Sequence, residues 1–270
     1  MKTLVVFSDP HSNSTVGLAD TTIQLDDGDK VAAGPIRRWL WYRYQETLDY
    51  IAKHAKGEIY GVLNGDAVEL DAKNRSQQVI SPSQEKAIEI ANSALTPFFE
   101  LCKGVYVVRG TEAHTGPSAQ AEEAIAINFD NSIKNTEANT SSWWHLPLIF
   151  DGVKMDIAHH PRGGNSGRPS GRQNLVNRMA HDTFFEYAEE GERPPDLVIR
   201  SHLHGYLDSF GAYKTRAIIT PAFSLLTAYE RRIGINKDND VGMIMITCDN
   251  GEYELKPIRH KVPRPQWVSL

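Results

Sequence analysis

The sequence of 270 residues has only two cysteines, Cys102 and Cys248, and neither stands in a Cys-x-x-Cys or Cys/His zinc spacing. This scarcity excludes a disulfide framework and a metal site built from thiolates. We expect two buried, reduced thiols.

Long apolar runs are also missing. The N-terminal run Leu4–Phe7 reaches Asp9 almost at once, so it is too short for a signal peptide or a membrane span. No other stretch approaches spanning length. The sequence therefore predicts a cytoplasmic protein with no membrane partner.

An excess of positive charge is absent as well. The formal net charge of -5 argues against a general nucleic-acid coat, because non-specific binding of nucleic acid rests on a basic surface. A local basic patch stays open. Internal repeats, low-complexity tracts and Pro/Ser-rich linkers are lacking too, which predicts a single domain over residues 1–270 and leaves the oligomeric state open.

Short apolar, Val/Ile-rich runs alternate with helical patterns along most of the chain. The predicted buried strands are Leu4–Phe7, Ile59–Leu63, Val105–Val108, Met155–Ala158 and Leu197–Ile199. The predicted helices are Pro35–Ala55, Ser83–Leu101 and Gln173–Glu190. This alternation is typical of an α/β protein.

Two regions depart from the alternation. The C-terminal third carries Ala217–Thr220, Gly242–Thr247 and Tyr253–Pro257 as strands joined by tight turns, which predicts a second, antiparallel-rich half. Ser12–Gly34 has little regular pattern, and we expect a long loop there.

Five predicted strands end in metal-binding or acid–base residues. The motifs are Asp9-Pro10-His11, Gly65-Asp66-Ala67-Val68-Glu69, Gly110-Thr111-Glu112-Ala113-His114, His159-His160 and His202-Leu203-His204. Ligands of open α/β sheets gather at the carboxyl ends of strands, so these side chains are expected to share one crevice. Each motif alone arises readily by chance. Their joint placement carries the prediction, because six of the ten histidines fall in them.

The residue types indicate a chemistry. Imidazole and carboxylate without thiolate suit Zn, Mn or Fe in a mixed nitrogen and oxygen site. His202 and His204 flank one residue, so on an extended segment they point to the same face, as do Asp9 and His11. Asp66 follows Gly65 at a sharp strand exit, where a carboxylate can bridge two cations. Two cations about 3.5–4 Å apart would activate a bridging hydroxide and neutralise charge on the phosphoryl group in the transition state.

Taken together, the motifs resemble the calcineurin-like metallophosphoesterase superfamily, and the resemblance runs from residue 9 to residue 204. It implies an α/β fold of four layers, two packed mixed β-sheets flanked by α-helices, with a dinuclear metal site. The cofactors it implies are two divalent transition metal ions, Mn, Fe or Zn, with Mn favoured. The ligands implied for the first ion are Asp9, His11 and His204, with Asp66 as the bridge. The ligands implied for the second ion are His159 and His202.

The third motif departs from the family pattern of Gly-Asn-His. Thr111 stands where the family has a ligating Asn, and a neutral hydroxyl is a poor ligand, so we expect Glu112 to take over that role. The alternative is a solvent-facing Glu112 and a weakly held second ion. His114 would be the displaced catalytic histidine and protonate the leaving group as general acid. Glu69 would orient it.

His160 stands where the family usually has Gly, which makes it a second-shell or substrate contact, or else a surface or packing residue. Arg162 and Arg168 lie on a Gly-rich segment after His159 and are candidates for clamping phosphate, since guanidinium matches phosphate oxygens bidentately. An ordinary surface loop explains them equally well. Arg109 is a further substrate-binding candidate, or a strand-end salt-bridge residue.

The predicted function is hydrolysis of phosphate mono- or diesters, with a substrate that can derive from a nucleotide or a nucleic acid. One alternative is a non-catalytic or one-metal binding protein that keeps the fold, which the altered third motif favours. The other is an amidohydrolase-like metal-dependent enzyme. Those barrels usually open with His-x-His on the first strand, whereas this chain opens with Asp9-Pro10-His11 and has too few β–α units.

Overall fold

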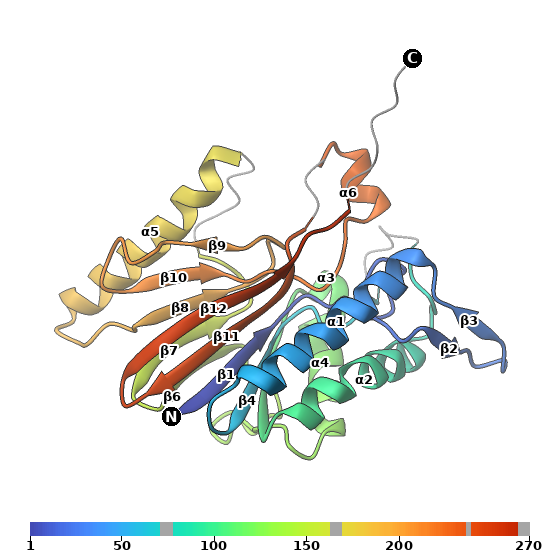
Figure 1. Cartoon of the computed structure of the whole chain (residues 1–270), viewed down its shortest axis with the longest axis horizontal. Coiled ribbons are helices and arrows are strands. Elements are labelled where there is room, and N and C mark those ends of the chain that lie inside the picture. The colour runs from blue at the N-terminus through green and yellow to red at the C-terminus, as the bar shows by residue number, and fades with distance from the viewer. Residues whose placement is uncertain (71–77, 163–168, 236–238, 264–270) are drawn as a thin grey trace.

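Two five-stranded β-sheets form the centre of the protein (Figure 1). The computed structural model describes residues 1–70, 78–162, 169–235 and 239–263. The first sheet has the order β12-β11-β1-β4-β5, and the second has the order β6-β7-β8-β10-β9. The strands of the first sheet are β1 (Lys2–Phe7), β4 (Ile59–Asn64), β5 (Gly104–Val108), β11 (Val241–Asp249) and β12 (Glu252–His260). Those of the second are β6 (His145–Phe150), β7 (Val153–Ala158), β8 (Leu197–Arg200), β9 (Leu207–Asp208) and β10 (Arg216–Ile219).

Both sheets are mixed. In the first, β1, β4 and β5 run parallel, while β11 and β12 are antiparallel additions beside β1. In the second, β7, β8 and β10 are parallel, and the edge strands β6 and β9 are antiparallel. The parallel strands of each sheet therefore end at a common edge, where the following loops can meet.

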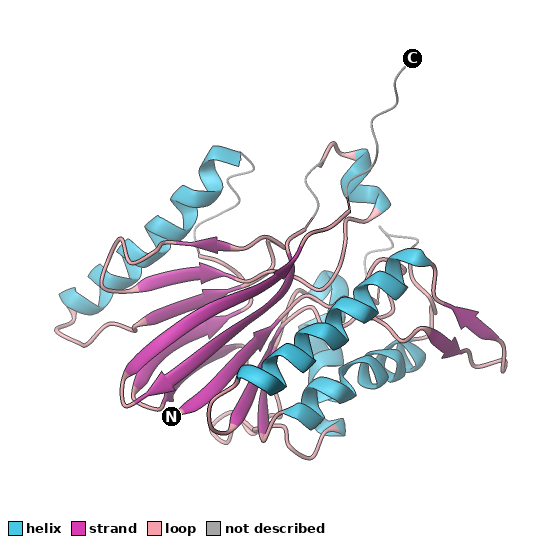
Figure 2. Ribbon diagram, in the orientation of Figure 1, coloured by secondary structure: helices cyan, strands magenta, loops and turns pink. Residues whose placement is uncertain are grey.

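Helices cover the outer faces of the two sheets (Figure 2). The helices beside the first sheet are α1 (Pro35–His54), α2 (Gln84–Leu101) and α4 (Gln120–Asn128). On the second sheet lies α5 (Pro169–Glu189). Helix α1 begins with Pro35 in its first turn, and Ser83 caps α2 by accepting a hydrogen bond from the Lys86 amide. Both starts follow from their local sequence, because these residues favour helix N-termini.

Strand β1 shows how the layers are packed. Val5 and Phe7 belong to the apolar cluster shared with α1 and α2. Leu4 and Val6 face the other way and pack with residues of the second sheet, including Leu197. A third cluster joins α5 to the opposite face of the second sheet. Successive side chains of a strand alternate between faces, so one strand serves two cores. The result is the order helix, sheet, sheet, helix, and the predicted four-layer fold is confirmed.

Three details of the predicted fold were wrong or incomplete. Ser12–Gly34 is not only loop, because it contains the hairpin β2 (Thr22–Gln24) and β3 (Lys30–Ala32). The C-terminal strands β11 and β12 do not form a separate half; they pair with β1 and complete the first sheet. Strand β6 was not foreseen, because Pro147 interrupts its pattern, and proline is tolerated in a strand at a sheet edge.

The remaining expectations concern the thiols and the membrane. Cys102 and Cys248 are both buried and free. None of the described helices is both long and apolar enough to cross a membrane.

The other short helices are α3 (Glu112–Thr115), the 3-10 helix η1 (Pro117–Ala119) and α6 (Ala228–Arg232).

Candidate metal centre

Loops from both sheets converge on one cluster of imidazoles and carboxylates. Backbone hydrogen bonds continue the parallel pairing past the strand ends: the Asp9 amide donates to the Gly65 carbonyl at 3.0 Å, and the His11 amide donates to the Asp66 carbonyl at 3.0 Å. In the second sheet the Ser201 amide donates to the His159 carbonyl at 2.8 Å. The loops are thereby fixed to the sheets, so the side chains that they carry are held in place.

The first group of candidate ligands comprises Asp9, His11 and His204. The Nε2 atoms of His11 and His204 lie 3.1 Å apart. His204 Nε2 is also 3.2 Å from Asp9 Oδ1. Asp66 Oδ2 lies 3.9 Å from His11 Nε2. A cation with ligand bonds of about 2.0–2.2 Å separates neighbouring donor atoms by about 3–3.5 Å. The spacings of 3.1 and 3.2 Å therefore suit a metal ion, and Asp66 lies slightly farther out at 3.9 Å.

The second group surrounds the other side of Asp66. Its Oδ2 atom lies 3.1 Å from His159 Nε2 and 3.8 Å from His202 Nδ1. His160 also belongs here, because its ligand atom lies within 4.8 Å of those of His159 and His202. Asp66 thus stands between the two groups, in the position of a bridge.

Two buried polar atoms of the cluster have no partner in hydrogen-bond geometry, although each lies 3.1 or 3.2 Å from another member of the cluster. They are Oδ1 of Asp9 and Nε2 of His159. Buried polar atoms are nearly always satisfied, so an orphaned oxygen and an orphaned nitrogen in one cluster fit a missing cation. The other ring nitrogen of His159, Nδ1, lies 2.8 Å from the Asn64 carbonyl and can donate to it. That hydrogen bond leaves the Nε2 lone pair for a metal, as is usual for ligating histidines.

The backbone at the cluster is strained. Five candidate ligands adopt a positive φ that non-glycine residues rarely tolerate: Asp9 (50°), His11 (43°), Asp66 (50°), His202 (70°) and His204 (49°). Such conformations are unfavourable and concentrate at functional sites, where the surrounding structure enforces them.

Two glycines let the loops approach one another closely. A Cβ on Gly110 would lie 2.3 Å from Asp66 Oδ1, and a Cβ on Gly65 would lie 2.2 Å from His159 Nδ1. Gly65 also has a φ of +80°. Any side chain at either position would therefore displace a candidate ligand.

The charges of the cluster are those of a cation site. Burial alone would raise the pKa of Asp66, but the adjacent imidazoles of His159 and His202 hold this pKa well below its usual range. For Glu69 burial is likewise overcome, here by hydrogen bonds from His11 and His114, which bring its pKa down to about 2. Both carboxylates are therefore ionised at neutral pH.

Glu69 and His114 form a hydrogen-bonded pair beside the first group. His114 Nδ1 lies 2.6 Å from Glu69 Oε2, and its ring centroid is 4.6 Å from that of His11. Burial would lower the pKa of His114, but the hydrogen bond to Glu69 and the charge of Asp66 raise it to about 9. A protonated His114 held by Nδ1 can present the proton on Nε2.

The third motif is arranged differently from its prediction. The Thr111 amide donates to Asp66 Oδ1 at 2.6 Å, so this residue holds the Asp66 carboxylate in place. Glu112 is exposed, and its carboxylate accepts a hydrogen bond from the Ser118 amide at 3.0 Å. The structure does not bring Glu112 into the described ligand groups, because α3 begins at this residue and turns its side chain toward η1.

The two described arginines among the predicted phosphate-binding residues, Arg109 and Arg162, form ion pairs with glutamates. Arg109 donates to Ser142 Oγ and to the Ser118 carbonyl, and it pairs with Glu123 at 3.0 Å, which agrees with the strand-end salt bridge. Arg162 is exposed and pairs with Glu186 of α5 at 2.5 Å. Arg168 lies outside the described residues.

Sequence reasoning missed Glu122 on α4. Its buried carboxylate accepts hydrogen bonds from the amides of Gly110, at 2.7 Å, and Ala67, at 3.3 Å. It thereby ties together the loops that follow β4 and β5. A glutamate in the first turn of a helix is ordinary, so no pattern in the sequence could have revealed this contact.

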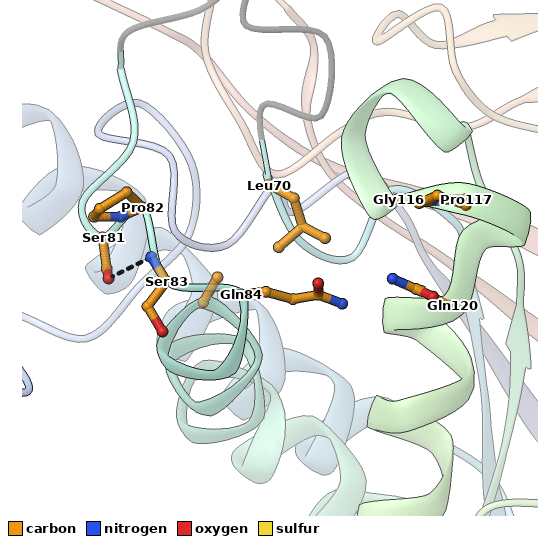
Figure 3. A pocket seen from close by; sticks show the side chains of 9 residues that line it. Leu70, Ser81, Pro82, Ser83, Gln84, Gly116, Pro117 and Gln120 are labelled. Carbon is orange, nitrogen blue, oxygen red and sulfur yellow. Dashed lines mark hydrogen bonds between the residues drawn. The ribbon is translucent and has the colours of Figure 1, made fainter.

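A pocket of about 210 Å³ lies between the first turns of α2 and α4, lined by Leu70 and Gly116 among others (Figure 3). Leu70 and Pro82 supply apolar walls, and the side-chain amides of Gln84 and Gln120 face one another across it. The Leu70 amide donates to the His114 carbonyl at 2.7 Å, which connects the pocket wall directly to the candidate acid.

No protein-family model and no curated protein matches the sequence. Among solved structures, the chain is similar to a conserved uncharacterized protein from Streptococcus pneumoniae TIGR4, described as a predicted phosphoesterase. The identity is 12% and the TM-score 0.39, over 96% of this chain and 89% of that one. It is also similar to a single mutant of Vps29 from Entamoeba histolytica, with 9% identity and a TM-score of 0.40 over 96% and 99% of the two chains.

A third similar structure is Vacuolar Protein Sorting 29 from Cryptosporidium parvum, with 12% identity and a TM-score of 0.36 over 97% and 98% of the two chains. The fold and the ligand groups agree with the resemblance to the calcineurin-like metallophosphoesterases.

Proposed function

We propose that this protein is a dinuclear metal-dependent phosphoesterase. The observation that carries the proposal is the meeting of Asp9, His11 and His204 with His159 and His202 around one buried carboxylate, Asp66. These six side chains come from four loops on two different sheets, and the orphaned atoms of Asp9 and His159 lie among them. Packing alone gives no reason to bury such a set.

The chain's own residues have distinct tasks in this proposal. When bound, two divalent cations lower the pKa of a water molecule and offset the charge of the phosphoryl group. Asp66 and Asp9 supply negative charge to hold the cations. His114 Nε2 carries a proton for the leaving-group oxygen, while Glu69 fixes the ring through Nδ1. Two bound cations, a water molecule and a proton donor are the groups that phosphoester hydrolysis of this kind requires.

The pocket between α2 and α4 favours a substrate whose leaving group carries hydrogen-bond donors and acceptors. Leu70 lines this pocket and donates its amide to the His114 carbonyl. A leaving group that takes its proton from His114 would therefore depart close to the pocket. Carboxamides such as Gln84 and Gln120 can both donate to and accept from a nucleobase. A nucleotide or nucleic-acid phosphate ester is therefore the substrate class that we propose, with either one or two ester bonds at phosphorus.

The test combines metal content with turnover. The metal-free chain is reloaded with Mn, Zn or Fe and given aryl phosphate mono- and diesters, nucleotides, cyclic nucleotides and oligonucleotides. We expect close to two ions per chain and metal-dependent hydrolysis. Asp66→Asn should lower kcat/KM on the order of 1,000-fold, since metal charge stabilisation is worth several kcal/mol and about 1.4 kcal/mol is a factor of ten.

The matched control is His181→Asn, which changes a histidine of α5 that lies 2.9 Å from Asp182. It should leave both metal content and turnover unchanged. If the reloaded wild type binds two ions but hydrolyses none of the esters, the protein is a metal-binding scaffold and the proposal fails.

A further inference from the structure

The second ligand group lacks one ligand of the family pattern. Thr111 stands in the place of the usual Asn, and its amide is already used by Asp66 Oδ1. Glu112, the next oxygen donor along the chain, points to the Ser118 amide. The loop after β5 therefore offers the second cation no more than a neutral hydroxyl.

His160 reaches the same place from the second sheet. Neighbouring residues of a regular strand point to opposite faces. Strand β7 ends at Ala158, however, and beyond it the rings of His159 and His160 lie with their centroids only 4.9 Å apart. The ring centroid of His160 is also 4.7 Å from that of His202. Three imidazoles thus surround one point next to Asp66.

Thr111 Oγ1 is separated from three surrounding donor atoms by the spacing expected between corners of a coordination shell. Thr111 Oγ1 lies 3.2 Å from His160 Nε2, 3.2 Å from His202 Nδ1 and 3.2 Å from Asp66 Oδ2. A tetrahedral site with metal–nitrogen bonds of about 2.0–2.1 Å has corners about 3.3 Å apart. His160 Nε2 therefore lies at ligand spacing from Thr111 Oγ1, and its ring offers a ligand atom within 4.8 Å of those of His159 and His202.

We propose that His160 is a protein ligand of the second cation and replaces the missing Asn. The inference rests on the proposed dinuclear site. With this ligand the two cation positions differ in their donor atoms. The second position has three imidazoles, whereas the first has two imidazoles and the Asp9 carboxylate, and both share Asp66. Imidazole favours Zn, whereas carboxylate favours Mn. The second position should therefore select Zn over Mn more strongly than the first.

The experiment measures metal binding on the full chain without relying on turnover. The metal-free wild type, His160→Ala and the control Glu112→Ala are titrated with Zn²⁺ alone and with Mn²⁺ alone, and bound metal is counted after dialysis. We expect two zinc ions in wild type and in Glu112→Ala. In His160→Ala the second zinc should bind at least about 100-fold more weakly, since even losing a partner of a ligand costs 10- to 100-fold.

A cysteine variant gives a positive signal that a structural role for residue 160 would not give. His160→Cys loaded with Co²⁺ should acquire a thiolate-to-cobalt charge-transfer band that the wild type lacks. Two tightly held zinc ions in His160→Ala and no such band in His160→Cys would overturn this inference while leaving the proposed function intact. A wild type that binds no cation would overturn both.

Discussion

At the scale of the residue, His114 shows how one histidine differs from the ligands around it. Its Nδ1 is engaged by Glu69 at 2.6 Å, and it groups with His11 and Glu69 rather than with Asp66. His159, by contrast, has its Nδ1 at the Asn64 carbonyl and its Nε2 turned toward Asp66. The partner of one ring nitrogen therefore decides whether the other nitrogen serves a proton or a metal.

The role that we propose for His114 as general acid predicts a dependence on the leaving group. His114→Asn should slow hydrolysis of esters with poor leaving groups, such as nucleotides, by about 10²–10⁴-fold, because their oxygen needs a proton. Nitrophenyl esters depart without one and should be affected much less. The measurement is kcat for a series of esters graded by leaving-group pKa, with metal content determined alongside. An equal loss across the series, with both ions retained, would contradict the role.

At the scale of the element, a buried ion pair fixes the strands that carry half of the site. Arg200 of β8 pairs with Asp156 of β7 at 2.6 Å, and His145 of β6 reaches the same carboxylate at 3.0 Å. Arg200 also donates to the Asp156 carbonyl at 2.8 Å. Because Arg200 directly precedes the segment with His202 and His204, this pair ties the ligand-bearing end of β8 to its neighbour.

The pair predicts both a loss of stability and a pH dependence. Burial would raise the pKa of Asp156, but His145 and Arg200 bring it from 3.8 down to about 2. A carboxyl with a depressed folded-state pKa stabilises above its unfolded pKa and loses that contribution as pH falls through the folded pKa. Asp156→Asn should cost about 3 kcal/mol at neutral pH, since it leaves a buried arginine unpaired.

Urea unfolding of the metal-free chain between pH 5 and pH 2 checks this prediction. The difference in unfolding free energy between wild type and Asp156→Asn should shrink by about 2 kcal/mol over the acidic part of that range. A difference that is independent of pH would show that the carboxylate is not the stabilising partner.

At the scale of the whole molecule, the cluster connects the two sheets. Asp9 and Asp66 follow strands of the first sheet, and His159, His202 and His204 follow strands of the second. Cations held between them would add to the contacts that already join the two layers, which include the apolar core and the hydrogen bond between His159 Nδ1 and the Asn64 carbonyl. Metal binding should therefore be visible in global stability, because a ligand that binds only the folded state stabilises it.

Chelation tests this coupling. With metal at about 100 times its dissociation constant, each site adds about 2.7 kcal/mol, which corresponds to a rise in melting temperature of about 5–10 °C for a chain of this size. Thermal unfolding followed by circular dichroism, with and without EDTA, measures the shift, and added Zn²⁺ should restore it. Identical melting temperatures in the two conditions would show that no cation joins the sheets.

Local rules were enough to predict the helices that begin at Pro35 and Gln84 and the buried strands. Residue type and position after a strand also singled out Asp9, Asp66 and His159, which the structure brings together. The hairpin inside residues 12–34 and the edge strand β6 were missed, because short or interrupted strands depend on partners that lie elsewhere in the chain.

The sequence by itself determined which chemistry this protein carries, since imidazole and carboxylate side chains at strand ends are a property of residue type and local pattern. Only the tertiary structure decided which of them meet. It placed His160 beside His202, turned Glu112 toward Ser118 and set Glu122 under Gly110. The physical reason is that side-chain direction beyond a strand end follows from the packing of two sheets and the strained loops between them, which no local pattern encodes.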